Sequence, residues 1–220
     1  MRSFLPALPR PSTARLALAA CVLAGGGVAV SAAPATAAAC AEVDVVVARG
    51  TGEPGTLGLI VGDPVYSALK GKLGLRSSSA YPVNYPADLS AGSASKGNTD
   101  LVEHLKSQAA ACPNQKFVLV GYSQGANVVD NSVGVSSEGA LVGGKITETI
   151  PASIEPRVKA VLVFGNPIRP LRSITGTYKS RTLDKCASGD PVCGNGVNVL
   201  AHLSYGGDAN EAATFAAARL

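Results

Sequence analysis

Residues 117–125 read Phe-Val-Leu-Val-Gly-Tyr-Ser-Gln-Gly, an apolar run that leads directly into the pattern G-x-S-x-G. In this pattern a serine occupies a strained turn between a strand and a helix, and the glycines two residues before and after it let the backbones pass closely. The stretch 126–129, Ala-Asn-Val-Val, is a plausible helix start. The sequence therefore predicts a nucleophilic Ser123 at the end of a buried strand. The alternative is an ordinary glycine turn that joins a strand to a helix.

Strand-like runs alternate with helix-like stretches on both sides of this turn. The β-branched runs Val43–Ala48 and Val158–Phe164 are typical of strands buried on both faces. Weaker strand signals and helical stretches complete the pattern: strands at 81–85 and 178–183, helices at 63–73, 98–111 and 211–219. The first helix would begin with Asp63 as its N-cap and Pro64 in its first turn. The alternation predicts an α/β fold, with one mostly parallel sheet, helices on both faces and sites at the carboxyl ends of the strands.

His202 is the candidate general base. In this strand–turn–helix arrangement the serine comes first along the chain, the acid second and the histidine last. The sequence contains two histidines, and only His202 follows Ser123. We interpret His104, on the predicted helix 98–111, as a structural residue. His202 directly precedes a predicted loop at 203–207. In this position it can face the serine with one imidazole nitrogen while a carboxylate holds the other.

The acid that orients this histidine must lie between the serine and the histidine in sequence. Asp190 is the first candidate, because its loop is bracketed by two cysteines that would fix the direction of the carboxylate. Asp184 is the second candidate. Asp130, on the helix after the serine, is expected to point away. For Asp190 the structural alternative is an ordinary Gly-Asp-Pro turn.

Residues 1–39 read as an export signal. The features are an arginine-containing start, an apolar run over 16–30 and a small-residue site, Ala-Thr-Ala, at 35–37. We expect cleavage within 33–39, a secreted protein and one domain over residues 40–220. A membrane anchor is the alternative, but the apolar run is shorter than the roughly 20 residues that a spanning helix needs. We therefore expect no stable membrane span in the mature chain.

The charge of the chain does not point to a nucleic-acid partner. The formal net charge is +4, but three of the 19 lysines and arginines and none of the 15 acidic residues lie in residues 1–39. The rest of the chain therefore has a formal net charge of +1, and it shows no basic face with interleaved aromatic residues. Neither Cys-x-x-Cys nor paired histidines occur, so no metal and no cofactor are predicted. We expect a monomer.

Four cysteines remain once Cys21 is removed with the signal, and an even number suits disulfides in an oxidising compartment. Four cysteines permit three pairings. The short separation favours Cys186 with Cys193, which leaves Cys40 with Cys112.

Together these motifs resemble the cutinase family of serine esterases, and most closely the cutinase-like esterases secreted by actinobacteria. The similarity covers nearly the whole chain after residue 39. It rests on Ala-Arg-Gly-Thr-Gly-Glu at 48–53, Tyr-Pro-Ala at 85–87, the motif at 121–125, the loop 186–193 with its internal Gly-Asp, His202, and the C-terminal run 212–220. The resemblance implies an α/β-hydrolase fold with a five-stranded, mostly parallel sheet and no large lid.

The resemblance also assigns roles to residues of this chain. It implies a catalytic triad of Ser123, Asp190 and His202, and an oxyanion hole at Thr51 and Gln124. The expected donors are the backbone N–H after the nucleophile and one from the loop after the first strand. It further implies the two disulfides preferred above.

The expected substrate is a carboxylic ester: a small ester, a lipid or a polyester surface. Apolar loop residues near the acid and base are candidates for an acyl groove, although they can equally belong to the core: Ile168, Leu171, Val197, Val199 and Leu200. A carbohydrate acetyl esterase is the alternative enzyme, and acyl transfer to an acceptor other than water is a third. From a different class, the chain can be a secreted binding module on an inactive esterase scaffold.

Overall fold

A computed structural model describes residues 40–220, and its centre is a five-stranded sheet. The strands are β1 (Val43–Ala48), β2 (Ser78–Pro82), β3 (Lys116–Tyr122), β4 (Val158–Phe164) and β5 (Thr182–Lys185). Their order is β2-β1-β3-β4-β5, and every neighbouring pair is parallel. The predicted α/β class and the five-stranded sheet are confirmed. The export signal predicted for residues 1–39 lies outside the described residues.

The strand order reverses beside β1. The chain passes from β1 outward to the edge strand β2 and then returns to build β3, β4 and β5 on the other side of β1. In open parallel sheets such a reversal leaves a crevice outside the carboxyl ends of the two central strands, and this crevice is where ligands bind. Thr51 follows β1 and Ser123 follows β3, so the topology brings both residues to this crevice.

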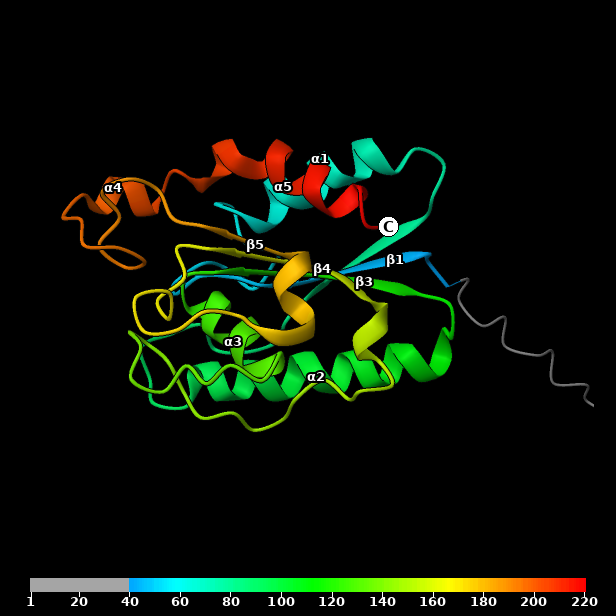
Figure 1. The fold of residues 1–220 in the computed structure, drawn as a ribbon, viewed down its shortest axis with the longest axis horizontal. Coiled ribbons are helices and arrows are strands. Elements are labelled where there is room, and N and C mark those ends of the chain that lie inside the picture. Colours follow the sequence, from blue (N-terminus) through cyan, green and yellow to red (C-terminus); the bar gives the residue numbers. More distant parts are fainter. Residues whose placement is uncertain (1–39) are drawn as a thin grey trace, which may run out of the picture. The chain divides into compact units, whose positions relative to one another are not determined.

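Helices cover both faces of the sheet (Figure 1). One face carries α1 (Gly62–Leu73) and α5 (Ala209–Ala217), and the other carries α2 (Ser93–Ala111) and α3 (Gln124–Ser132). The short helix α4 (Val199–His202) lies beyond the end of the sheet. Three 3₁₀ helices complete the described elements: Glu155–Arg157, Gly176–Arg181 and Tyr205–Asp208.

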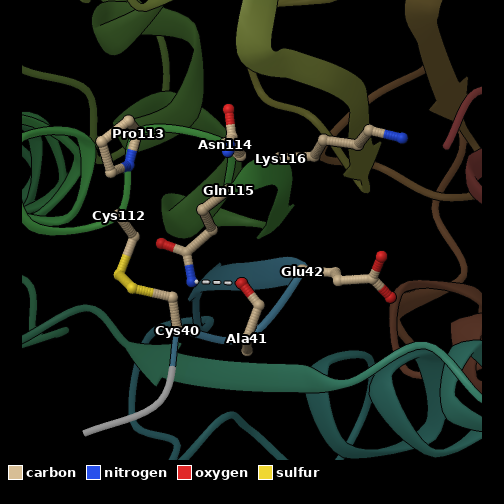
Figure 2. A pocket seen from close by; sticks show the side chains of 8 residues that line it. All are labelled: Cys40, Ala41, Glu42, Cys112, Pro113, Asn114, Gln115 and Lys116. Atoms are coloured by element: carbon tan, nitrogen blue, oxygen red, sulfur yellow. Dashed lines mark hydrogen bonds between the residues drawn. A yellow bond between two sulfur atoms is a disulfide. The ribbon is translucent and has the colours of Figure 1, made fainter. Parts of the chain in front are cut away.

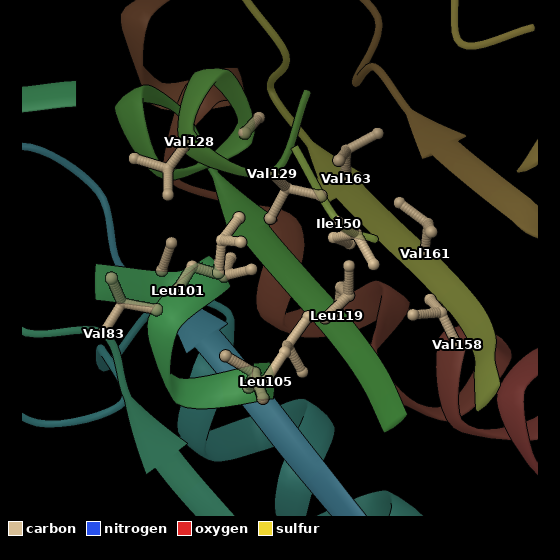
Figure 3. Close-up of a cluster of buried hydrophobic side chains, with 14 of the residues drawn as sticks. Val83, Leu101, Leu105, Leu119, Val128, Val129, Ile150, Val158, Val161 and Val163 are labelled. Carbon is tan, nitrogen blue, oxygen red and sulfur yellow. The ribbon is translucent and has the colours of Figure 1, made fainter. Parts of the chain in front are cut away.

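Alternating side chains of the central strands form two apolar cores. On one face Val46, Leu119 and Val161 pack against α2 and α3. Figure 3 shows Leu119 and Val161 beside Leu105 of α2 and Val128 of α3. On the other face, side chains such as Val45, Val118 and Leu162 pack against Leu69 of α1 and the alanines of α5. Because both faces are covered, β1 and β4 are apolar almost throughout, as the sequence predicts.

Several element boundaries differ from the sequence prediction. Helix α1 begins at Gly62, so Asp63 lies within its first turn and is not the N-cap. Helix α2 begins at Ser93 rather than at 98, because its first turn buries small and polar residues that give no apolar periodicity. The run 178–183 begins as a 3₁₀ helix, and strand β5 starts only at Thr182.

Two disulfides close loops at different ends of the molecule. Cys40 and Cys112 have their Cα atoms 5.7 Å apart and join the start of β1 to the end of α2. Beside this disulfide the Gln115 side-chain amide donates to the Ala41 carbonyl at 3.0 Å (Figure 2). Cys186 and Cys193, also with Cα atoms 5.7 Å apart, close the loop that contains Asp190.

Among residues 40–220, no helix is both long enough and apolar enough to cross a bilayer.

Candidate active site

Ser123 occupies the sharp turn between β3 and α3, with φ 53° and ψ −119°. A non-glycine residue with this backbone is strained, and such strain is typical of functional turns. Glycines make the turn possible. A Cβ on Gly125 would lie 1.9 Å from the Ala48 carbonyl oxygen, and a Cβ on Gly121 would lie 2.5 Å from the Gly125 oxygen. The motif therefore reflects close backbone packing that presents the serine side chain at the carboxyl end of the central strand β3.

The structure places His202 between Ser123 and Asp190. The Nε2 atom of His202 lies 2.9 Å from the Ser123 Oγ, and the Nδ1 atom lies 2.8 Å from the Asp190 Oδ2. The Asp190 side chain is fully buried, whereas the imidazole retains 12% of its surface. A buried carboxylate holding one ring nitrogen leaves the other free to accept the serine proton.

Asp190 accepts three hydrogen bonds. Its Oδ1 accepts from the Val192 N–H at 2.6 Å, and its Oδ2 accepts from the Tyr205 hydroxyl at 2.5 Å and from His202. Burial raises the pKa of Asp190, but the hydrogen bonds from Tyr205, His202 and Val192 outweigh that cost and lower the pKa below its ordinary value. The carboxylate therefore stays ionised at neutral pH, which favours an imidazolium beside it.

The other candidates lie elsewhere. Asp184 pairs with Arg169, with 3.4 Å between Oδ1 and Nη1. Asp130 is buried on α3, where burial and the nearby Asp184 raise its pKa well above the ordinary value. His104 lies 2.7 Å from the Asp44 carboxylate and stacks on a tyrosine ring. His104 is thus structural, as its position on a helix indicates.

The loop after β1 presents Thr51 to the serine. The neighbouring Gly50 N–H donates to the Glu53 carboxylate at 2.7 Å, and the Gly52 N–H donates to the Ala87 carbonyl at 2.8 Å. These two bonds fix the loop on both sides of Thr51. The buried Thr51 hydroxyl has no hydrogen-bond partner among residues 40–220. A buried hydroxyl without a partner is costly, so it is suited to donate to a substrate.

Gln124 has separate uses for its backbone and its side chain. It is the first residue of α3, so its N–H lies in the turn where a helix offers no internal acceptor. Its side chain is buried rather than exposed: Nε2 donates to the Asp88 carbonyl at 2.8 Å and Oε1 accepts from the Ser93 hydroxyl at 3.2 Å.

Amide side chains of α3 hold the loop after this helix, whose Leu141 and Val142 line the same cavity as the serine. Gln124, Asn127 and Asn131 share one face of the helix, and they donate to the carbonyls of Val142 at 3.5 Å, Leu141 at 2.9 Å and Gly144 at 3.1 Å. Val142 itself has φ 48°, a conformation that is rare for a β-branched residue. The loop is therefore fixed relative to the nucleophile, and the local strain at Val142 is maintained by these contacts.

A cavity of about 270 Å³ opens beside Ser123. Its lining is mainly apolar: Thr51, Ile60, Leu89, Tyr122, Ser123, Leu141, Val142, Val192, His202 and Leu203. Several of these leucines are largely exposed at the rim, with 79% of Leu89 and 63% of Leu141 accessible. The volume is slightly below the usual range of small-molecule sites, about 300–1,000 Å³.

The predicted acyl-groove residues do not line this cavity. Ile168 is fully buried in the interior, so its prediction as a groove residue is wrong. Four others are exposed and lie outside the cavity lining: Leu171, Val197, Val199 and Leu200. Two residues next to the acid and base in sequence, Val192 and Leu203, do line the cavity, but half of the lining comes from the loops after β1, β2 and α3, which sequence proximity to the acid and base does not indicate. Tyr205 was also missed, since nothing in the sequence signals the partner of a buried hydroxyl.

The fold and this site define the class of the chain. A parallel sheet with helices on both faces and a serine on the turn after a central strand is the arrangement of the α/β hydrolases. The chain is an α/β hydrolase.

Comparison with known proteins gives the family. The family model described as Cutinase matches residues 39–220. A cutinase of Kineococcus radiotolerans is 44% identical over 190 residues, which cover 82% of this chain and 62% of that protein. Carboxylesterase Culp1 of Mycobacterium tuberculosis is 39% identical over 194 residues, which cover 82% of each chain. The chain belongs to the cutinase family and is a carboxylic ester hydrolase.

A solved structure agrees with this assignment. Trichoderma reesei cutinase in complex with a phosphonate inhibitor has a TM-score of 0.66 and 33% identity, covering 80% of this chain and 75% of that chain. The expectation that the sequence resembles the cutinase family is confirmed, as is its similarity to actinobacterial members.

Proposed function

We propose that this protein is a secreted serine esterase that hydrolyses short- to medium-chain carboxylic esters through an acyl-enzyme on Ser123. The observation that carries the proposal is the continuous set of hydrogen bonds from Ser123 through His202 to Asp190 at the mouth of an apolar cavity. The names of its relatives, cutinase and carboxylesterase, support the same reaction class.

The proposed reaction has two halves. His202 Nε2 accepts the proton of the Ser123 hydroxyl while Oγ attacks the ester carbonyl carbon. When the tetrahedral intermediate collapses, the bond to the alcohol oxygen breaks and His202 returns its proton to the leaving alcohol. Water then gives a proton to His202 and attacks the acyl-enzyme, and when the second intermediate collapses the bond from the acyl carbon to Oγ breaks, His202 returns its proton to Oγ, and the acid is released. Asp190 stays ionised throughout and holds the imidazole in the required tautomer.

Thr51 and Gln124 are the proposed oxyanion donors. The N–H of Gln124 begins α3 directly after the serine, and the N–H of Thr51 lies on the loop after β1. The unpartnered Thr51 hydroxyl adds a third donor. Donors that are already fixed in place stabilise the developing oxyanion without reorganisation.

Substituting Thr51 with valine tests the hydroxyl. The exchange keeps the shape of the side chain but removes its donor, so kcat is expected to fall about 10²-fold. KM should change little, because the oxyanion exists only in the transition state. Steady-state kinetics on p-nitrophenyl butyrate measures both constants.

Thr51→Ser is the matched control, since it keeps the hydroxyl and loses a methyl group. Its kcat should stay within about threefold of the wild type. Equal kcat values for Thr51→Val and the wild type would show that backbone N–H groups alone form the oxyanion hole.

The size and lining of the cavity support short- to medium-chain esters. It is small, apolar and rimmed by exposed leucines, so an acyl chain of a few carbons can be buried while a longer chain must extend along the rim. We expect p-nitrophenyl ester turnover to be highest from butyrate to octanoate and lower for acetate and palmitate.

The alternatives give different profiles in the same assay. Turnover confined to acetyl esters would favour a carbohydrate acetyl esterase. A folded protein without activity on any ester would favour a binding module with an inactive scaffold. The two disulfides and the signal-like residues 1–39 support the proposed extracellular location.

A further inference from the structure

Tyr205 is a fully buried tyrosine. Its hydroxyl lies against the loop 186–193 that carries Asp190, the acid loop. The hydroxyl donates to Asp190 Oδ2 at 2.5 Å, accepts from the Ala187 N–H at 3.0 Å, and lies 3.3 Å from the Cys193 sulfur. It therefore contacts the acid, the backbone of the acid loop and the disulfide that closes this loop.

The ring of Tyr205 also packs beside the general base. Its plane is nearly perpendicular to the His202 imidazole, at 89° with 6.1 Å between ring centroids. Edge contacts with Tyr122 and Phe164 fix the ring on its other sides. The titratable groups that face Tyr205 are Asp190, His202 and Tyr122, and the cysteine beside it is in a disulfide.

We propose that Tyr205 is a positioning residue of the ester hydrolase reaction, which sets both the direction and the basicity of Asp190 through its hydroxyl. The inference rests on the proposed function of Ser123, His202 and Asp190. Tyr205 touches neither the substrate nor the reacting atoms, so it acts only through the acid.

The shared acceptor atom is the physical reason. Tyr205 and His202 both donate to Oδ2 of Asp190, so they draw on the same negative charge. A donor on this oxygen weakens the stabilisation that the carboxylate gives to a protonated imidazole. Burial and the bond to Asp190 raise the pKa of Tyr205, so the phenol stays a neutral donor at every working pH.

Tyr205→Phe removes the donor while keeping the ring. We expect kcat/KM at its pH optimum to fall about tenfold, the lower end of the loss that follows removal of hydrogen-bond partners that orient metal ligands. The acid limb of the kcat/KM–pH profile should move to higher pH by about half a unit, because Asp190 then stabilises the protonated imidazole more strongly. A residue that only packs the core would lower stability without moving this limb.

Tyr178→Phe is the matched control. The Tyr178 hydroxyl is buried and has no hydrogen-bond partner within residues 40–220, and it lies in the 3₁₀ helix before β5. Its removal should leave both the profile and kcat/KM as in the wild type. A Tyr205→Phe profile that also matches the wild type would overturn the proposal.

Replacing Tyr205 with 3-fluorotyrosine provides a second test that does not depend on losing the hydroxyl. Its phenol is more acidic and so a stronger donor, and the acid limb should move to lower pH, opposite to Tyr205→Phe. A shift of both variants in the same direction would overturn the proposal. Ser123→Ala distinguishes failure of this inference from failure of the proposed function. If Ser123→Ala is inactive but both Tyr205 variants behave like the wild type, only the inference about Tyr205 fails.

Discussion

Ser123→Ala is expected to abolish ester hydrolysis, with a fall in kcat of about 10⁵- to 10⁶-fold. Without the Oγ atom no acyl-enzyme forms, and His202 has no nucleophile to activate. The residual rate should come from the oxyanion donors and the cavity, which still bind the ester. Alanine keeps the Cβ that serine already places in the turn at φ 53°, so the substitution adds no new backbone strain and the fold should be retained. The measurement is steady-state hydrolysis of p-nitrophenyl butyrate, with circular dichroism to verify folding.

A fluorophosphonate probe gives an independent readout of the same residue. The wild type should be labelled covalently and Ser123→Ala should not. Ser107→Ala, which removes an exposed serine hydroxyl on α2, is the matched control and should be labelled like the wild type. Substantial hydrolysis by a folded Ser123→Ala variant would contradict the acyl-enzyme mechanism and the proposed role of the turn.

The strands that could be predicted from sequence are those whose environment is uniform. The sequence predicts two strands with the bounds that the structure shows, Val43–Ala48 and Val158–Phe164. Burial on both faces requires an apolar residue at almost every position of such a strand. The start of α2 could not be predicted in this way. Its first turns bury Ser93 and Asn98, and the Asn98 amide bonds to the Glu148 carbonyl, a partner far away in sequence.

The site could be predicted in part for a similar reason. A strained turn between a strand and a helix requires glycines at fixed spacing, so the local sequence alone predicts the position of Ser123. The cavity is different, because Leu89 and Leu141 reach it only through the folding of separate loops. The carbonyl acceptors that hold Leu141 and Val142 are backbone atoms, and no residue type signals them.

Asp190→Asn is expected to lower kcat/KM about 10⁴-fold while the protein stays folded. The side-chain amide has the same shape, but an NH₂ facing His202 Nδ1 favours the wrong imidazole tautomer, and its neutral group no longer stabilises the imidazolium.

The low pKa of Asp190 in the wild type also contributes to the free energy of unfolding. This contribution is present above the pKa of the unfolded carboxyl and is lost as the pH falls through the lower folded value. The variant should therefore show a flatter dependence of unfolding free energy on pH at the acidic end.

Asp184→Asn is the matched control, because Asp184 is the other acid that the sequence allows for this role. It pairs with Arg169 rather than with His202, so its activity should stay within about threefold of the wild type. Burial raises the pKa of Asp184, which is the opposite of the shift that a general acid–base partner of an imidazolium requires. A larger loss in Asp184→Asn than in Asp190→Asn would reassign the acid. The large loss in Asp190→Asn alone would make the disulfide-closed loop the source of the charge that holds His202.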